Sequence, residues 1–438
     1  MHGTKIARTR RGRDFSLRTV GSAIVLVAGA LVLPAVPAQA QTTCDGLPVT
    51  ITGTPGNDTL TGTDGNDVIL ALAGNDIVSG LAGNDTACLG PGNDTFSGGA
   101  GGDTSVAEAT VDGSDTFFGG ENGDTVSYAT RAVPVTISLD GIPDDGAAGE
   151  ADNNAGDVEH ANGGTQGDTM TGNLQRNILR GGLGNDTMNA VGGDLVIGDA
   201  GEDNLRVISS SGNPDLRGES GNDTLTGGSG NDRRVGGAGA DTIRGGDGAD
   251  TMHGSAGDDL LNGQDGDDDM FGDEGADRLA GGVGADSMSG NAGDDLFDGE
   301  AGDDFAIGDA GNDTILTGST SDGADRFLGG AGIDTADYSR RNHPISGPFL
   351  RVSLDGETND GLPDENDNIG VDVENARGGI GRNILVGNAL SNVLNGGPNS
   401  DLIFTEDGIL GNDRAIGNAG SDSCTIDPGD VADCEIVH

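Results

Sequence analysis

The stretch "GGDGADTMHGSAGDDLLNGQDGDDDM", from Gly245 to Met270, repeats one short pattern. Glycine recurs at every ninth position, and an aspartate follows it at a fixed distance, as Asp250, Asp259 and Asp268. The stretch contains no lysine or arginine that could balance these carboxylates. A strict period of nine residues predicts a solenoid, in which each repeat is one structural unit stacked against others.

In nine-residue frames the pattern extends into two arrays. The first has six units from Gly53, beginning GTPGNDTLT and GTDGNDVIL. The second has eleven units in unbroken register from Gly218 to Leu316, beginning GESGNDTLT and GGSGNDRRV. The shared pattern is G-G-x-G-x-D-x-U-x, where U is a bulky apolar residue.

Each position of the repeat has a physical role. The glycines at the first, second and fourth places admit positive φ, so the chain can turn tightly, and they leave room for a ligand to approach the backbone. The last three residues predict one short strand, whose middle residue points inward. Arg234 is the exception among apolar inward residues, and the sequence suggests only a locally frayed coil there. The inward residues of the second array are Leu225, Arg234, Ile243, Met252, Leu261, Met270, Leu279, Met288, Phe297, Ala306 and Ile315.

The aspartates would repel one another if the repeats stacked without a metal. Strands of successive coils lie about 4.8 Å apart, and two carboxylates at about 5 Å repel by roughly 3 kcal/mol at an effective dielectric constant of about 20. A divalent cation between stacked turns reverses the sign of that interaction, and turn carbonyls supply further oxygen ligands of the kind that Ca²⁺ prefers. The alternative is a solvated acidic rim on a metal-free solenoid, which the same repulsion disfavours. An EF-hand loop starting at Asp265 is excluded, because its sixth and twelfth places hold Met270 and Ala276 instead of glycine and glutamate.

These repeats resemble the nonapeptide of RTX, or hemolysin-type calcium-binding repeat, proteins. The resemblance implies an all-β fold: a right-handed parallel β-roll or β-helix solenoid of nonapeptide repeats, here with two irregular β inserts. It also implies two repeats to a turn and multiple Ca²⁺ ions as cofactors, each between a loop and the loop one turn on. The calcium ligands that it implies are Asp58, Asp67, Asp76, Asp85, Asp94, Asp103, Asp186, Asp223, Asp232, Asp241, Asp250, Asp259, Asp268, Asp277, Asp286, Asp295, Asp304 and Asp313.

Two stretches break the register and resemble each other, which indicates an internal duplication. They begin at Tyr128 and Tyr338, and each is followed by a neutral unit in which Asn177 or Asn392 replaces the aspartate, so the row of ligands should pause there. Each opens with alternating apolar residues that predict a longer strand: Val135, Ile137 and Leu139, and Leu350, Val352 and Leu354. The acids that follow form either a separate calcium site or a solvated flap. They are Asp140, Asp144, Asp145, Glu150, Asp152, Asp157 and Glu159, and Asp355, Asp360, Asp364, Glu365, Asp367, Asp372 and Glu374.

Composition and the N-terminus bear on location and partners. The chain has 22 Lys+Arg against 73 Asp+Glu, a formal net charge of -51, which argues against nucleic acid and anionic membranes and for cations as partners. A basic region, an apolar stretch from Ala23 to Val36 and an A-Q-A cleavage pattern ending at Ala40 indicate a secretory signal peptide over residues 1–40. A membrane anchor is the alternative reading of that segment, and no other segment is expected to insert into a membrane.

The cysteines also fit export. There are four, and the simplest pairing is Cys44–Cys88 and Cys424–Cys434, with the crossed connectivity or two free pairs as alternatives. The spacing of a zinc site is absent from the sequence.

The sequence contains no HExxH, GxSxG or P-loop motif, and no GxGxxG that opens a helix after a strand. We therefore assign no catalytic residue and do not expect an enzyme. We expect a secreted calcium-binding repeat protein that folds on binding Ca²⁺ outside the cell, with a structural, surface or interaction role. It would be extracellular or associated with the cell surface, and a cell-surface or glycan partner stays open. The alternative is an extracellular hydrolase or carbohydrate-active protein that uses the inserts.

The sequence thus divides into seven segments. They are the signal peptide (1–40), a first RTX β-roll array with an N-terminal cysteine cap (41–106), an irregular insert (107–162), degenerate repeats (163–206), a second and long RTX array (207–316), the duplicated insert (317–377), and degenerate repeats with a cysteine-stapled C-terminal cap (378–438).

Overall fold

The structure is a computed structural model, and it describes residues 43–209, 212–319 and 322–438. The predicted signal peptide lies outside the described residues. Every regular element of the described residues is a strand, and turns, bends and irregular segments connect the strands. Within these residues, no helix has the length and apolar character that a membrane crossing requires.

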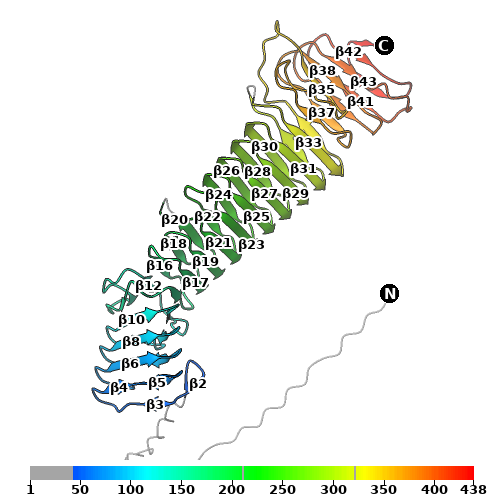
Figure 1. Cartoon of the computed structure of the whole chain (residues 1–438). Coiled ribbons are helices and arrows are strands. Elements are labelled where there is room, and N and C mark those ends of the chain that lie inside the picture. Colours follow the sequence, from blue (N-terminus) through cyan, green and yellow to red (C-terminus); the bar gives the residue numbers. More distant parts are fainter. Residues whose placement is uncertain (1–42, 210–211, 320–321) are drawn as a thin grey trace, which may run out of the picture. The chain divides into compact units, whose positions relative to one another are not determined.

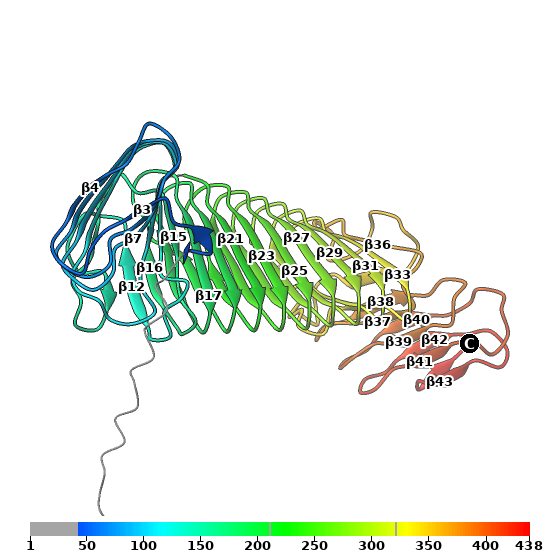
Figure 2. The ribbon, with the colours of Figure 1, turned by 90° about the horizontal axis from the view of Figure 1, so that it is seen from below.

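The described chain winds as a parallel β-solenoid (Figure 1), and its coils stack on one another (Figure 2). Two sheets of 16 strands each run along it. In the long array, consecutive strands join these two sheets alternately, so two nonapeptides close one coil. The pairing of Thr242 with Leu260 and of Ile243 with Leu261 shows that register, in which residues 18 apart in the sequence are neighbours. The predicted all-β solenoid with two repeats to a turn is confirmed.

The first long sheet contains, in spatial order, β3 (Ile51–Thr52), β5 (Val68–Leu70), β7 (Thr86–Cys88), β9 (Thr104–Val106), β11 (Thr125–Ser127), β15 (His160–Asn162), β17 (Ile178–Leu183), β19 (Leu195–Ala200), β21 (Asp215–Ser220), β23 (Arg233–Ala238), β25 (Thr251–Ala256), β27 (Asp269–Glu274), β29 (Ser287–Ala292), β31 (Phe305–Ala310), β33 (Arg326–Ala331) and β36 (Asn368–Ile369). The second long sheet contains β13 (Gly146–Ala147), β12 (Val135–Ser138), β16 (Thr169–Thr171), β18 (Thr187–Ala190), β20 (Asn204–Val207), β22 (Thr224–Thr226), β24 (Thr242–Asp247), β26 (Leu260–Asp265), β28 (Arg278–Val283), β30 (Leu296–Ala301), β32 (Thr314–Leu316), β34 (Thr335–Asp337), β37 (Asn375–Arg377), β39 (Val393–Asn395), β41 (Arg414–Ile416) and β43 (Val431–Asp433).

Three shorter sheets complete the described fold. One contains β14 (Asn153–Asn154), β10 (Thr116–Glu121), β8 (Thr95–Ala100), β6 (Ile77–Ala82) and β4 (Thr59–Thr61); another contains β35 (Leu350–Ser353), β38 (Asn383–Val386), β40 (Leu402–Phe404), β42 (Ser423–Thr425) and β44 (Ile436–Val437); and β1 (Thr43–Cys44) pairs with β2 (Leu47–Pro48). The β1–β2 and β12–β13 pairs are antiparallel, and the other strand pairs within the sheets are parallel.

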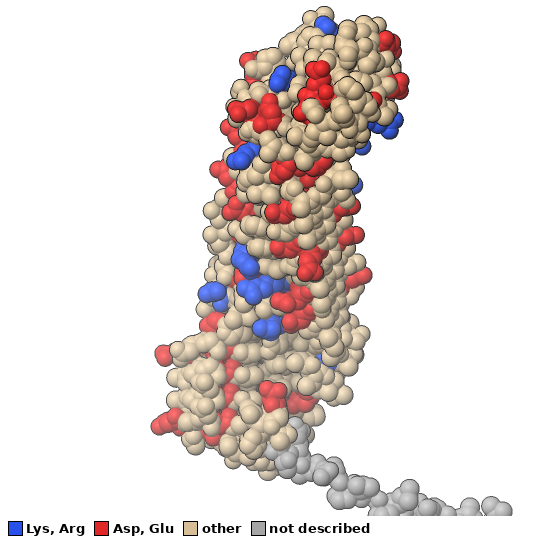
Figure 3. All heavy atoms as spheres, turned by 90° about the vertical axis from the view of Figure 1, so that its right-hand side faces the viewer, with Lys and Arg blue, Asp and Glu red and all other residues tan. Residues whose placement is uncertain are grey.

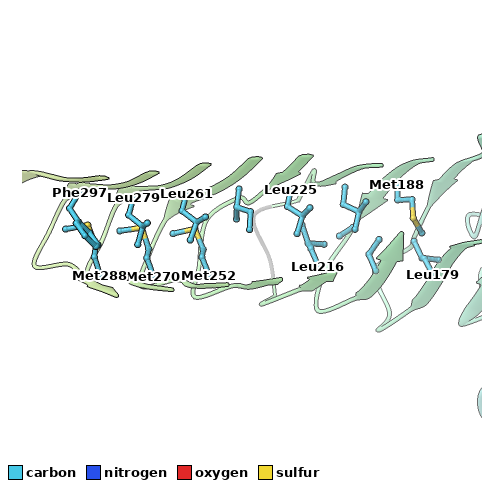
Figure 4. Close-up of a cluster of buried hydrophobic side chains, with 14 of the residues drawn as sticks. Leu179, Met188, Leu216, Leu225, Met252, Leu261, Met270, Leu279, Met288 and Phe297 are labelled. Carbon is cyan, nitrogen blue, oxygen red and sulfur yellow. The ribbon is translucent and has the colours of Figure 1, made fainter. Parts of the chain in front are cut away.

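The core is a double row of apolar side chains between the two long sheets. Leu261, Leu279 and Phe297 point from one sheet toward Met252, Met270 and Met288 on the other (Figure 4), and all six are at most 1% exposed. The period-two alternation of a strand places the middle residue of each repeat inside. The predicted inward residues of the second array are buried, as expected.

Arg234 is buried with them. Its side chain is fully inaccessible to solvent, and it lies between Leu216 and Met252 in the register of the first long sheet. The expectation of a frayed coil at Arg234 is wrong, because its guanidinium group finds buried oxygen partners, which are described below.

The strands of the long array are longer than the expected three residues. β24, for example, runs from Thr242 into the glycine pair of the next repeat and ends at Asp247. The expected positive φ holds at only two of the three glycine places. Second-place Gly246 and fourth-place Gly248 have positive φ, at 117° and 125°, whereas first-place glycines such as Gly254 do not adopt this conformation. The first place needs glycine for a different reason, which involves the aspartate of the same repeat.

Both ends of the described chain carry a disulfide. Cys44 of β1 is bonded to Cys88 of β7, and Cys424 of β42 is bonded to Cys434, which follows β43. The first bond ties the β1–β2 hairpin to β7, the third strand of the first long sheet, and the second ties β42 to the residue that follows β43, the last strand of the second long sheet.

Candidate metal centre

The sixth-place aspartates form a continuous ladder from coil to coil. The backbone amide of Asp241 donates to Oδ1 of Asp259 at 2.7 Å, and the amide of Asp259 donates to Oδ1 of Asp277 at 2.8 Å. Each aspartate directly precedes a strand, so the parallel register repeats the contact every 18 residues along both edges of the long array. The ladder fixes each carboxylate through one oxygen and leaves the other free to face a ligand.

That second oxygen, Oδ2, is buried without a hydrogen-bond donor. Asp259 is only 2% exposed, and no donor of the described residues reaches its Oδ2. The aspartates of the predicted set that share this feature are Asp76, Asp85, Asp94, Asp103, Asp186, Asp223, Asp241, Asp250, Asp259, Asp268, Asp277, Asp286, Asp295, Asp304 and Asp313. Buried polar atoms are almost always satisfied in proteins, so a row of unsatisfied carboxylate oxygens indicates a cation.

The first-place glycine of the repeat lies beside this unsatisfied Oδ2. A methyl group added to Gly254 would lie 2.6 Å from the carbonyl oxygen of Gly272, one coil on, and against Oδ2 of Asp259. An aspartate oxygen and a carbonyl oxygen therefore face one small space that a side chain would fill. The same arrangement recurs at Gly80, Gly181, Gly198, Gly218, Gly236, Gly245, Gly263, Gly281 and Gly308. We call this arrangement the cradle.

The donor set of the cradle fits calcium. Its oxygens come from a carboxylate and from backbone carbonyls, which are hard ligands suited to Ca²⁺. No group of three or more His, Cys, Asp or Glu side chains converges on one point in the part of the chain that the structure describes. A metal ion held here must therefore take some of its ligands from the backbone.

Burial and mutual repulsion shift the pKa of the ladder carboxyls upward. The pKa of Asp259 is raised from 3.8 to about 7, mainly by burial and then by the charges of Asp241 and Asp277, although the amide hydrogen bond from Asp241 opposes the shift. The pKa values of Asp223 and Asp295 are raised to about 7 for the same reasons. Near neutral pH, the stacked carboxyls need either protons or a cation.

The exposed Asp and Glu side chains in Figure 3 are distinct from these buried ladder carboxyls and lie along the visible face.

Three aspartates of the predicted set are different. Oδ2 of Asp58 accepts hydrogen bonds from the Thr54 amide and hydroxyl at 2.5 and 2.9 Å, and Oδ2 of Asp67 accepts from the Thr63 amide and hydroxyl at 2.6 and 2.9 Å. Asp232 is bonded to Arg234. In addition, Oδ2 of Asp250 lies 3.4 Å from the same guanidinium group.

Sequence reasoning missed further members of the ladder. Unsatisfied Oδ2 atoms also occur at Asp124, Asp203, Asp334, Asp401, Asp413 and Asp422. Each of these residues precedes a short strand, as in GDTVS at Asp124, so a search for Asp-x-apolar that tolerated insertions would have found them.

The inserts continue the ladder. The amide of Asp115 donates to Oδ1 of Asp152 at 2.9 Å, and the amide of Asp124 donates to Oε2 of Glu159 at 2.9 Å. The second insert repeats this contact, because the backbone amide of Asp334 donates to Oε2 of Glu374 at 2.8 Å.

The insert acids divide into three groups, of which the half-buried one comprises Glu150, Asp157, Glu159, Asp372 and Glu374. Asp145, Asp152, Asp360, Glu365 and Asp367 are buried, so the solvated-flap alternative is wrong for them. They are buried because they bond to their own insert. Asp145 accepts the amides of Ser138 and Asn154, for example, and Asp360 accepts those of Ser353 and Ile369. The exposed insert acids, for which the flap description holds, are Asp140, Asp144, Asp355 and Asp364.

The neutral units carry asparagine at the ladder position. Asn177 donates through Nδ2 to the Glu159 carbonyl at 3.1 Å, and Asn392 donates to the Glu374 carbonyl at 3.0 Å. An amide nitrogen therefore supplies a donor in these coils.

Replacing the cradle glycine Gly254 with alanine is expected to remove one bound calcium ion, because the new methyl group occupies the space between the two oxygens. The matched control is Gly193→Ala, where an added methyl group meets no atom within 4 Å and φ is not positive. Native mass spectrometry of the calcium-saturated variants measures the count. Equal counts in the two variants would show that the cradle holds no ion.

Comparison with known families agrees with this geometry. The model of the RTX calcium-binding nonapeptide repeat matches residues 52–87, 89–105, 162–194, 209–243, 244–279, 271–306, 280–315, 298–336 and 377–409. Together these matches cover more than half of the chain. A search of the curated proteins finds no match. The chain belongs to the family of RTX calcium-binding nonapeptide repeat proteins.

Proposed function

We propose that this chain is a secreted calcium-binding repeat protein whose solenoid becomes ordered when Ca²⁺ binds outside the cell. The observation that carries the proposal is the row of buried carboxylate oxygens that lack a donor within the described residues, such as Oδ2 of Asp259 beside the Gly272 carbonyl. A buried charge without a partner is costly, and an ion shared between coils removes that cost. The ordered solenoid then serves a structural, surface or interaction role.

In this proposal each ion binds Oδ2 of a sixth-place aspartate and a turn carbonyl of the neighbouring coil. The ligands are the predicted aspartates with an unsatisfied Oδ2. The ladder members Asp124, Asp203, Asp334, Asp401, Asp413 and Asp422, which the repeat pattern missed, join them. The number of ions is then set by how many cradles lack a nitrogen donor from the chain itself.

Secretion is supported by two features. The segment 1–40 has the pattern of a signal peptide, and two disulfides are typical of an oxidising compartment. Extracellular calcium modules commonly bind with dissociation constants of about 10⁻⁴–10⁻³ M, so the chain would become ordered where calcium is about millimolar.

Isothermal titration calorimetry of the metal-free chain with CaCl₂ and, separately, with MgCl₂ tests the proposal. We expect strong binding heat with calcium and little with magnesium, because Mg²⁺ needs near-octahedral geometry at about 2.0–2.1 Å and gives up its water reluctantly. Equal responses to the two ions, or no response to calcium, would contradict the proposal.

A further inference from the structure

Arg234 brings a positive charge into the metal-binding edge of the long array. Its Nη2 donates to Oδ2 of Asp232 at 2.8 Å and to the carbonyl oxygen of Gly245 at 2.6 Å. Its Nη1 lies 3.4 Å from Oδ2 of Asp250. The side chains of Arg234, Asp232 and Asp250 are all fully buried.

The guanidinium group lies in the cradle of its own coil. In that coil the first-place glycine is Gly227, the aspartate is Asp232 and the carbonyl of the next coil belongs to Gly245. A methyl group added to Gly227 would collide first with Nη2 of Arg234 and then with the Gly245 carbonyl oxygen. In the equivalent place beside Gly254, the nearest atoms are Oδ2 and Cβ of Asp259 and the Gly272 carbonyl oxygen, and none of them is a nitrogen.

We propose that the guanidinium group of Arg234 is an internal cation that replaces calcium in this coil. The inference rests on the proposed function, in which the open cradles bind calcium. The group supplies a charge that proteins cannot titrate away, together with several N–H donors in a fixed plane. It donates to Oδ2 of Asp232 and to the Gly245 carbonyl oxygen, which a metal ion would otherwise take, and its charge lies 3.4 Å from Oδ2 of Asp250, so the coil of Asp232 needs no metal.

A second coil shows the same substitution with a neutral group. Nδ2 of Asn383 donates to the carbonyl oxygen of Gly396 at 2.7 Å and to Oδ1 of Asp401 at 2.9 Å. Asn383 is fully buried at the ladder position. There the amide replaces the carboxylate itself, whereas Arg234 leaves both carboxylates in place. The coil of Asp232 therefore keeps the oxygens of a calcium site and differs only in what occupies it.

Buried arginines in the inserts use the same chemistry. Nη2 of Arg131 lies 2.5 Å from Asp112 and 2.9 Å from Glu150. Arg341 lies 2.7 Å from Asp322 and 3.3 Å from Glu365 in the duplicated insert. In each case a guanidinium group joins two acids from different loops. Arg234 is distinguished from both by its place in a cradle.

Substituting Arg234 with isoleucine, the residue type at the inward position of Ile243, is expected to create a calcium site. Asp232, Asp250 and the Gly245 carbonyl would then face an open space like that of the other coils. The full chain with Arg234→Ile should bind one more calcium ion than the wild type. Native mass spectrometry of the calcium-saturated proteins measures that difference directly.

Arg233→Ile is the matched control. Arg233 is the neighbouring residue, but its side chain is 47% exposed and pairs with Asp215 at 3.3 Å outside the cradle. This control should bind the same number of ions as the wild type. If Arg234→Ile folds and its count also equals that of the wild type, the inference is overturned.

A reverse substitution decides the matter if Arg234→Ile fails to fold. Met270 occupies the equivalent inward position two coils further on, above the cradle of Gly263 and Asp268. Met270→Arg should place a guanidinium group in that cradle and lower the calcium count by one. An unchanged count would overturn the inference. A wild-type chain that binds no calcium would instead contradict the proposed function, so the two failures are distinguishable.

Discussion

Removal of calcium with excess EDTA is expected to abolish most of the β-sheet circular dichroism of this protein and to expand the chain. Without the metal, the carboxylates of Asp241, Asp259 and Asp277 remain stacked with a buried oxygen on each. Neighbouring carboxylates about 5 Å apart repel by roughly 3 kcal/mol at an effective dielectric constant of about 20. That repulsion recurs at every coil, while each nonapeptide buries only one large apolar side chain.

Far-UV circular dichroism and size-exclusion chromatography, before and after dialysis against EDTA, measure both effects. No reductant is added, so Cys44–Cys88 and Cys424–Cys434 stay closed and cannot account for the loss of structure. Addition of calcium above the chelator concentration should restore the strand signal. A chain that keeps its strand signal and its elution volume after exhaustive dialysis would contradict the ladder as the source of calcium dependence.

The long array could be predicted from the sequence almost residue by residue. A period of nine with one bulky residue per unit defines which side chains lie inside, and Leu261, Met270 and Phe297 are buried accordingly. The ladder aspartates follow from the same period, because two nonapeptides per coil bring Asp259 to Asp277. Periodicity carries this information because every coil repeats the same local conformation.

Features that depend on contacts between coils could not be predicted. The repeat pattern predicts a frayed coil at Arg234, because the local sequence does not show that its side chain can reach the Gly245 carbonyl. The sequence predicts both positive φ and room for a ligand at the first-place glycines; the positive φ is wrong for Gly254, and the oxygens that lie beside it, from Asp259 and from Gly272 of the next coil, could not be identified from the pattern. Asp124 was missed because an insertion shifts its phase, although its pairing distance in space is unchanged.

The burial of the insert acids also depends on tertiary contacts, so it could not be predicted from the sequence. Tyr128 donates to Oδ2 of Asp152 at 2.8 Å, and Tyr338 donates to Oδ2 of Asp367 at 2.9 Å. Both tyrosines are at most 2% exposed, so an acidic segment that looks like a solvated flap is instead folded over the core. The duplication was visible in the sequence, but the direction in which its acids point was not.

Acidification is expected to replace calcium in part, so that the metal-free chain gains strand signal as the pH is lowered from 8 to about 5. The folded-state pKa values of Asp223, Asp259 and Asp295 are raised from 3.8 to about 7, chiefly by burial. A raised carboxyl pKa means that the folded chain binds more protons than the unfolded chain between these values, so the free energy of unfolding falls as pH rises. The contribution is complete below about pH 3.8 and is lost as pH rises through about 7.

The affinity for calcium should change with pH in the opposite direction and fall as the pH is lowered, because protons compete with the metal for Oδ2 of the ladder aspartates. Circular dichroism titrations with calcium at pH 8 and pH 5.5 should therefore give a higher calcium midpoint at the lower pH. The same titrations in EDTA measure the proton effect alone. Asp67 should not add to the gain at low pH, because hydrogen bonds from Thr63 and Thr50 outweigh its burial and lower its pKa. A metal-free chain with its greatest strand signal at pH 8 would show that burial of these carboxyls does not govern the stability of the solenoid.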